Sequence, residues 1–344
     1  MMTKDELRMR ILANQHITCK ADKFTVVRDL CGIQAQFTVH AYHALKIRCS
    51  DELIPDTWGE GLVKNWTIRG TVHVFDENDL PLFLHDGRTN YLRPQDTMES
   101  DHCISSERKK MFADYIVKLI GEGICEREAL KDECFKIGMT EQECKNLFDP
   151  WGGIIRALAE QGLICYKVQE KKAFKLCPPF APMDREKAML EIARRYFTGF
   201  APATIKDAAY FLGTTQARVK TWLNQLPVNS ITVDGNTYFF IDNGRTDFPE
   251  IPGCVLLSGF DQLMLGYHKQ QNLFLPPEHV RGIFNLAGIV FPAILLHGKV
   301  VGRWKKDRSK LTFMLFEGIT GDDKKEILST AEMLWNDIKR ISWE

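Results

Sequence analysis

The stretch SITVDGNTYFFID, residues 230–242, carries the strongest local structural signal in the chain. Its Asp234-Gly235 pair separates two runs of β-branched and aromatic residues. Asp-Gly is preferred in two-residue hairpin turns, because such turns require positive φ at both central positions. The stretch therefore predicts a β-hairpin. Helical segments are expected before it, at about 184–197, at about 204–212, and after Gly213-Thr214 to about Leu226. Three helices followed by a hairpin are typical of a winged helix-turn-helix domain.

The middle third of the chain repeats this order. Helices are predicted at about 107–121 and 150–161, and Thr140-Glu-Gln-Glu143 has the spacing of a capping box between them. LICYKVQEKKAFKLC, residues 163–177, then reads as two short β segments around a basic loop. A second winged-helix unit is therefore expected here.

The N-terminal third has the same pattern. A capping box at Thr3–Glu6 predicts a first helix, and further helices are expected at about 21–33 and 40–48. NWTIRGTVHVF, residues 65–75, follows and predicts a strand pair or a kinked strand. The chain thus predicts three winged-helix units in tandem.

The pattern changes after Cys254. FPAILLHGKVVGRWK, residues 291–305, predicts two strands joined through His297-Gly298-Lys299, and LTFMLFEG, residues 311–318, predicts a third. A final helix is expected at about 322–341. The expected fold class is α+β, with tandem winged helix-turn-helix domains followed by a C-terminal antiparallel β-barrel-like module. The expected domains are 1–100, 101–180, 181–250 and 251–344.

Composition excludes several classes of protein. No apolar run approaches the ~20 residues that span a bilayer, and the N-terminus lacks the apolar segment of a signal peptide. We therefore expect a cytoplasmic protein. The ten cysteines show no C-x-x-C spacing, so simple thiols are expected, with no metal and no other cofactor. The 45 basic residues balance the 45 acidic ones, which counts against a sequence-independent DNA coat without excluding one basic face.

Gln34-Ala35-Gln36 is the motif with the most unusual setting. It lies just after Gly32 and between two predicted helices. Residues two apart do not share a helix face, so the two amides converge only if the backbone is not helical there, which Gly32 permits. The motif is either a solvated helix end or a pair of amides directed at a ligand, and its composition alone favours the solvated helix end.

Four blocks, in order along nearly the whole chain, resemble the tandem winged-helix DNA glycosylases of the AlkZ/YcaQ type. They are LCGIQAQ, NWTIRGTVHVF, LLSGFDQLMLGYHKQ at 256–270 and FPAILLHGKVVGRWK. In that family a Gln-apolar-Gln or Gln-x-Asp motif marks the catalytic position, and Gln34-Ala35-Gln36 resembles the first form. The resemblance implies three winged helices and a C-terminal β-barrel around duplex DNA. It also implies catalytic roles for Gln34 and Gln36.

A neutral amide suits one kind of glycosidic substrate. Hydrolysis needs a leaving base that accepts electrons and a water molecule near an oxocarbenium-like sugar. An N7- or N3-alkylated purine is already cationic and leaves without an acid, so the enzyme needs mainly to hold water. A glutamine carbonyl oxygen can accept a hydrogen bond from that water. We expect Gln34 to position the water and Gln36 to support it or to contact the lesion strand.

Basic residues supply the candidates for DNA contacts. Arg69 and His73 share a short β unit and could hold a phosphate, although a surface arginine and a half-buried histidine are the alternative. In residues 301–310 five basic residues accompany one acidic residue, which also fits a solvated face. A loop at a presumed wing tip contributes Lys171 and Lys172. The expected DNA-binding residues are Arg69, His73, Lys171, Lys172, Arg303, Lys305, Lys306 and Arg308.

Two other functions remain open at this level. A non-enzymatic winged-helix transcriptional regulator would bind particular sequences and release no base, and a protein-protein scaffold would show no salt-dependent DNA affinity. We expect a monofunctional DNA glycosylase acting in base excision repair of alkylation damage. Its expected partner is duplex DNA with alkylated bases. We expect a monomer with no membrane contact and no obligate protein partner.

Overall fold

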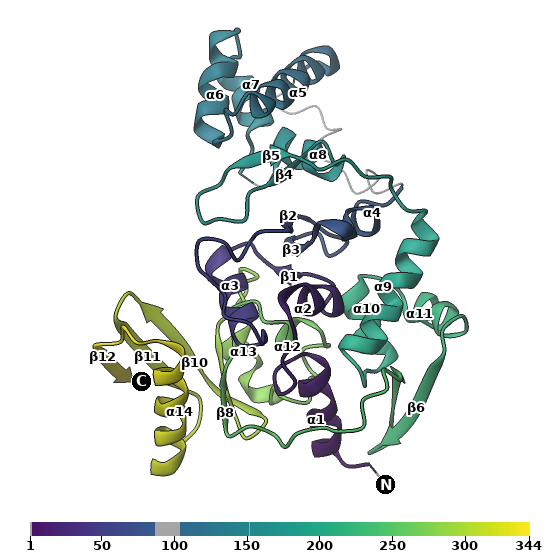
Figure 1. Cartoon of the computed structure of the whole chain (residues 1–344), viewed down its shortest axis with the longest axis vertical. Coiled ribbons are helices and arrows are strands. Elements are labelled where there is room, and N and C mark those ends of the chain that lie inside the picture. The colour runs from purple at the N-terminus through teal and green to yellow at the C-terminus, as the bar shows by residue number, and fades with distance from the viewer. Residues whose placement is uncertain (1, 87–103, 151) are drawn as a thin grey trace. The chain divides into compact units, whose positions relative to one another are not determined.

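The computed structural model describes residues 2–86, 104–150 and 152–344. The chain forms two compact units: Met1–Trp58 combines with Ile192–Glu344, and Gly59–Glu191 forms the other (Figure 1). Helices and strands mix in both, so the α+β class is confirmed. This division is coarser than the four expected domains, whose boundaries stay a prediction.

The first unit begins with three short helices. The helix α1 (Lys4–Asn14) starts at the expected capping box of Thr3 and Glu6. The helix α2 (Lys23–Asp29) is shorter than expected, because Cys31 and Gly32 adopt φ values of 52° and 83° that end the helical path. A two-residue strand, β1 (Ile33–Gln34), precedes α3 (Thr38–Lys46).

The predicted hairpin also lies in the first unit. The long helix α9 (Arg185–Gly199) leads to α10 (Ile205–Leu212) and α11 (Gln216–Leu223). The strands β6 (Val228–Val233) and β7 (Asn236–Ile241) pair antiparallel, with Val233 opposite Asn236. Asp234 and Gly235 have φ values of 49° and 76°, so the predicted two-residue turn is confirmed.

The C-terminal module is an open sheet with strand order β12-β11-β10-β9-β8. Within the described residues no closed barrel forms, so the expected barrel-like closure is not confirmed. The module is mostly antiparallel, as expected, and its one parallel pair in the described residues is β11 with β12. The strands are β8 (Cys254–Leu256), β9 (Ala293–Leu296), β10 (Lys299–Asp307), β11 (Lys310–Leu315) and β12 (Arg340–Trp343).

The helices of this module are α12 (Gln262–Leu265), α13 (Val280–Ile283) and α14 (Gly321–Leu334). The last ends seven residues before the expected Ile341. Its end has a tertiary cause: Trp335 takes an extended conformation, and its ring stacks on His43 with centroids 5.4 Å apart.

The second unit pairs its strands in the order β3-β2-β4-β5. These are β2 (Leu62–Trp66), β3 (Val72–Asp76), β4 (Ile164–Tyr166) and β5 (Phe174–Leu176). Its helices are α4 (Leu80–Phe83), α5 (Ser106–Gly121), α6 (Arg127–Lys136), α7 (Glu141–Leu147) and α8 (Gly153–Glu160). The capping box predicted at Thr140 begins α7, and a core of its own around Phe112 and Leu130 holds the unit together. Across the described chain, no helix is both long and apolar enough to cross a bilayer.

Candidate functional site

The backbone of Gln34-Ala35-Gln36 is not helical, which is the condition for the two amides to converge. Gln34 ends β1, and Gln36 lies in a bend just before α3. Gln34 is 6% exposed and Gln36 is exposed. Among the described residues neither carboxamide has a side-chain hydrogen-bond partner, and neither polar atom of Gln34 is among the fully enclosed ones. Both amides are therefore available to a ligand or a water molecule.

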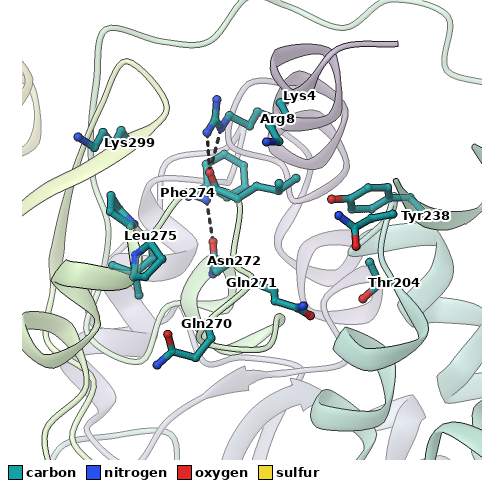
Figure 2. A pocket seen from close by; sticks show the side chains of 14 residues that line it. Lys4, Arg8, Thr204, Tyr238, Gln270, Gln271, Asn272, Phe274, Leu275 and Lys299 are labelled. Carbon is teal, nitrogen blue, oxygen red and sulfur yellow. Dashed lines mark hydrogen bonds between the residues drawn. The ribbon is translucent and has the colours of Figure 1, made fainter. Parts of the chain in front are cut away.

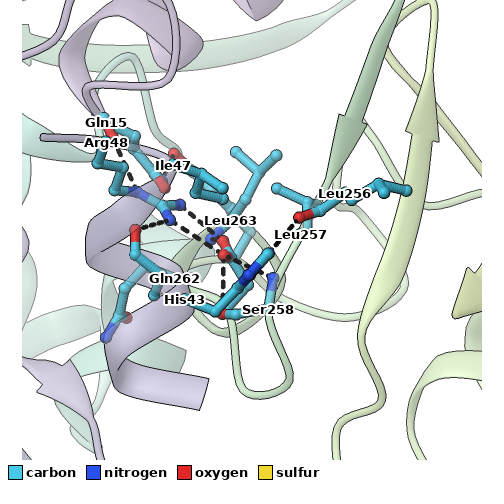
Figure 3. A network of polar contacts seen from close by, with 12 residues as sticks. Gln15, His43, Ile47, Arg48, Leu256, Leu257, Ser258, Gln262 and Leu263 are labelled. Atoms are coloured by element: carbon cyan, nitrogen blue, oxygen red, sulfur yellow. Dashed lines mark hydrogen bonds and ion pairs between the residues drawn. The ribbon is translucent and has the colours of Figure 1, made fainter. Parts of the chain in front are cut away.

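The segment 256–265 fastens this motif to the rest of the first unit. The Gln262 amide donates to the carbonyl oxygen of Gly32 over 2.8 Å. The buried Arg48 guanidinium, from just after α3, makes a two-pronged contact with the Asp261 carboxylate at 3.0 and 2.7 Å (Figure 3). Burial alone would raise the pKa of Asp261, but the Arg48 charge and hydrogen bonds outweigh it and lower that pKa. The ion pair fixes α3 relative to the turn that carries Gly259 and Phe260.

His43 makes a second attachment between α3 and this segment. Its Nε2 donates to the Leu256 carbonyl oxygen over 2.7 Å (Figure 3). The Trp304 indole donates to the neighbouring Leu257 carbonyl oxygen over 2.9 Å. Burial lowers the pKa of His43 to about 4, so its imidazole is neutral at physiological pH. A neutral His43 is a structural brace and carries no charge into the site.

A cleft of about 1070 Å³ begins one residue after Gln36. The exposed N-terminal end of α3 forms one wall with Phe37 and His40, and β10 and β11 form another. Phe37 stacks on Phe260 with centroids 5.9 Å apart and an interplanar angle of 27°. Phe260 has a φ of 56°, which is rare for a bulky residue and is typical of functional sites. This cleft was not predicted from the sequence. The glycine of Gly259-Phe260-Asp261, in LLSGFDQL, was the one local signal of an unusual turn.

The expected DNA-binding residues of the first unit gather along this cleft. Arg303, Lys305, Lys306 and Arg308 all line it. The Arg303 guanidinium lies 4.4 Å from the Phe291 ring centroid. Lys306 is already engaged, since its Nζ contacts Asp337 at 2.8 Å. Within the described chain, Lys305 and Arg308 have no ion-pair partner and are exposed.

The expected residues of the second unit do not form one group. Arg69 lies in the turn after β2, whereas Lys171 and Lys172 lie in the loop after β4. The antiparallel pairing of Lys64 with Tyr166 places that turn and that loop at opposite ends of the sheet. Lys171 pairs with Glu126 at 2.7 Å, and Lys172 is exposed.

His73 is the remaining expected residue of this unit. It is fully buried, and its Nδ1 lies 3.0 Å from both the Thr67 hydroxyl and the Thr71 carbonyl oxygen. These contacts brace the β2–β3 turn that carries Arg69, and direct DNA contact by the buried His73 stays a prediction.

A smaller pocket of about 350 Å³ lies beside α1 and β7 (Figure 2). Its cations have partners: Lys4 pairs with Asp234 at 2.8 Å, and Lys299 pairs with Glu317 at 3.0 Å. Arg8 donates to the Leu273 carbonyl oxygen (Figure 2). These contacts join distant segments of the first unit and leave little net charge for an anion. Among the residues that the structure describes, no cluster of histidine, cysteine and carboxylate side chains could hold a metal ion.

Residues 27–335 match the family described as "DNA glycosylase AlkZ-like". The chain belongs to the AlkZ-like family of DNA glycosylases. A curated relative from Streptomyces sahachiroi, named "Interstrand DNA cross-link repair glycosylase", is 23% identical over 309 residues, which is 81% of this chain and 81% of the relative. The solved structure named "Streptomyces sahachiroi DNA glycosylase AlkZ" matches with a TM-score of 0.78 at 20% identity, covering 100% of this chain and 99% of the other. The fold of this AlkZ-like chain is thus that of a solved DNA glycosylase, and membership of the family supports DNA binding and DNA repair.

Proposed function

We propose that this protein hydrolyses the N-glycosidic bond of cationic N7- or N3-alkylated purines in duplex DNA, as a monofunctional glycosylase. The observation that carries the proposal is a pair of carboxamides, Gln34 and Gln36, on a non-helical backbone in a member of a glycosylase family; neither has a hydrogen-bond partner among the residues that the structure describes. We also propose that tandem winged helices and a barrel-like module form the architecture that holds the DNA.

Gln34 is assigned to water. The residue is 6% exposed, so its amide can hold one water molecule at a narrow opening with few competing solvent molecules. The Oε1 atom accepts a hydrogen bond from the water and orients an oxygen lone pair toward the anomeric carbon. The amide is too weak a base to remove a proton early, so the leaving purine must depart because of its own positive charge. Hydrolysis of neutral purines is therefore expected to be negligible.

Gln36 is assigned to the lesion strand. It is exposed, and it precedes the wall of the cleft by one residue. An exposed amide can donate to a phosphate or sugar oxygen while Gln34 holds the water. Arg69, Lys171, Lys172, Arg303, Lys305, Lys306 and Arg308 are proposed as phosphate contacts along the duplex, which set affinity and salt dependence rather than sequence preference.

The relative's name suggests a wider substrate class. A bifunctional alkylating agent that joins two purine N7 atoms leaves both bases cationic, so each linked base is activated in the same way as a single adduct. We extend the proposal to such interstrand cross-links, because the chemistry demanded of Gln34 is unchanged.

The experiment is release of free N7-methylguanine from a duplex that carries one such base. Wild type should release it, and Gln34→Ala should reduce the single-turnover rate by roughly 10²–10³-fold, the effect of losing one positioned polar group. Gln270→Ala is the matched control, because Gln270 is an exposed glutamine of the same unit that lies away from the motif. Equal rates for Gln34→Ala and Gln270→Ala would remove Gln34 from the mechanism.

Lysines with lowered pKa values define the second candidate, a bifunctional glycosylase-lyase. Burial lowers the pKa of Lys20 and of Lys64 to about 8, and a neutral amine is the nucleophile of a Schiff-base mechanism. Borohydride treatment during turnover distinguishes the two. The monofunctional enzyme should give no covalent protein-DNA adduct, whereas an adduct lost in Lys64→Met or Lys20→Met would favour the lyase.

A further inference from the structure

We propose that the cleft of Phe37, His40 and Phe260 takes an unstacked, uncharged nucleobase of the DNA, next to the nucleotide that is hydrolysed. The inference rests on the proposed function for the identity of the partner as DNA. It assigns a second subsite, distinct from the hydrolytic one, because neither Gln34 nor Gln36 lines the cleft.

The walls have the chemistry of a stacking platform. Phe37 is 44% exposed and covers Phe260, and the His40 ring lies 6.0 and 6.2 Å from the two phenyl rings. Burial lowers the pKa of His40, so this ring also presents a neutral aromatic face. Aromatic faces of this kind accept any base, because every base has a π face.

The turn beneath Phe37 is built for this position. A Cβ atom on Gly259 would lie 2.7 Å from the His40 ring, so only glycine lets the turn approach α3 this closely. The next residue, Phe260, is held at positive φ, and the buried Arg48–Asp261 ion pair anchors the residue after it. The cleft wall is therefore rigid before any ligand arrives, which lowers the entropy cost of binding.

The charge of the rim identifies the occupant as part of a nucleic acid. Six lysine and arginine side chains line the cleft against one glutamate, Glu344. Three of the six, Lys305, Arg308 and Lys310, are exposed and have no ion-pair partner in the described part of the chain. The Nε atom of Arg303 is enclosed and likewise lacks a partner among the described residues. An aromatic floor inside a cationic rim suits a base whose flanking phosphates lie on the rim.

The same charge disfavours the lesion base itself. A cationic alkylpurine would enter a site with a net positive rim, and like charges repel. A neutral base, either the partner of the lesion or its neighbour in the strand, meets no such cost. The volume, about 1070 Å³, slightly exceeds the ~300–1000 Å³ range of pockets that enclose small ligands, so a base with its sugar fits.

Binding to undamaged DNA tests the subsite without hydrolysis. The probes are a duplex with one unpaired 2-aminopurine bulge and the same duplex with that base paired. We expect the protein to bind the bulged probe at least about fivefold more tightly than the paired probe and to quench its fluorescence, since stacking on one aromatic side chain contributes this much.

Phe37→Ala should abolish the preference and the quenching, and Phe37→Trp should keep both. Met333→Ala is the control, because Met333 is 77% exposed on α14 and does not line the cleft. If Phe37→Ala unfolds at a lower temperature than wild type, Phe37→Leu replaces it, since leucine keeps apolar bulk but has no π face. Equal binding of both probes, or a Phe37→Leu variant with the wild-type preference, would overturn the proposal.

The salt dependence of binding tests the basic residues of the rim separately. The double variant Lys305→Gln with Arg308→Gln should make the dependence of log affinity on log salt shallower for the bulged probe. The magnitude of the slope should fall by about 2, one for each lost phosphate contact. Lys325→Gln, on the exposed face of α14, should leave the slope unchanged. An unchanged slope in the double variant would remove the rim from the site.

The two proposals fail separately. Loss of base release with an intact bulge preference would refute the hydrolytic assignment and keep the subsite. Base release with no bulge preference would do the reverse. Retention of the bulge preference in Gln34→Ala is the expected result, because Gln34 is outside the cleft.

Discussion

Gln34 and Gln36 differ in exposure, and that difference separates their proposed roles. Gln34 is almost enclosed at 6% exposure, which suits one held water, whereas Gln36 is open to solvent and suits a strand. The backbone of Gln34-Ala35-Gln36 is not helical, and it is in a regular helix that residues two apart face different sides. The pair can therefore serve one nucleotide from adjacent positions, which a helix would not allow.

Gln36→Ala should consequently affect binding more than chemistry. We expect a loss of roughly tenfold in affinity for alkylated duplex, about the worth of one hydrogen bond to a charged group, and a smaller loss in the single-turnover rate at saturating protein. Titration and rate measurements on the same duplex separate the two. A rate loss as large as that of Gln34→Ala, with unchanged affinity, would place Gln36 on the water instead.

The lowered pKa of His43 predicts that the folded state loses stability in acid. Its folded pKa is about 4 against 6.5 for an unperturbed histidine, so the unfolded state binds more protons between these values. Stability should fall as pH drops from 6.5 to 4, by roughly 3 kcal/mol for this one group. Urea unfolding across this range checks it. His43→Gln keeps a hydrogen-bond donor but cannot titrate, so its stability should depend less on pH than that of wild type.

At the scale of elements, the buried ion pair between Arg48 and Asp261 joins α3 to the turn before α12. Both side chains are fully enclosed. Arg48→Met should destabilise the first unit by about 3–5 kcal/mol, because the Asp261 charge is left buried and unpaired. Arg48→Met combined with Asp261→Leu should recover much of the loss, as measured by urea unfolding. No recovery would mean that the hydrogen bonds of Arg48 to the Gln15 and Ala44 carbonyl oxygens matter more than the charges.

The close approach of α9 to α2 gives a second test of packing. A Cβ atom on Gly199 would lie 2.1 Å from the Asp29 carbonyl oxygen, a backbone atom that cannot move aside as a side chain can. Gly199→Ala should therefore destabilise by about 3 kcal/mol, and thermal unfolding measures it. Gly213→Ala, where nothing lies within 4 Å, isolates the cost of positive φ without a clash.

At the scale of the whole molecule, the chain leaves its first unit at Trp58 and returns at Ile192. In the described residues the core around Leu130 belongs to the second unit, and that around Leu7 belongs to the first. Calorimetry should resolve two unfolding transitions. Leu130→Ala should lower one and Leu7→Ala the other, each by about 2–5 kcal/mol of stability. A single transition that moves as a whole in both variants would contradict independent folding.

The sequence by itself determined what is encoded within a few residues. The capping boxes at Thr3 and Thr140 and the hairpin at Asp234-Gly235 follow from local hydrogen bonds and allowed φ values. These local preferences do not depend on contacts with residues that are distant in sequence. The order of blocks along the chain was likewise readable, and so was the family.

Only the tertiary structure decided which distant residues meet. It brought Phe260 beneath Phe37, buried His73, ended α14 where Trp335 packs on His43, and paired β12 parallel to β11. Each outcome depends on packing between segments far apart in sequence, and periodicity holds no information about the partner. Gln34 and Gln36 became candidates through the family resemblance of the sequence, and their roles stay a proposal. The aromatic cleft could not be predicted, because a cleft is a property of surfaces that only folding brings together.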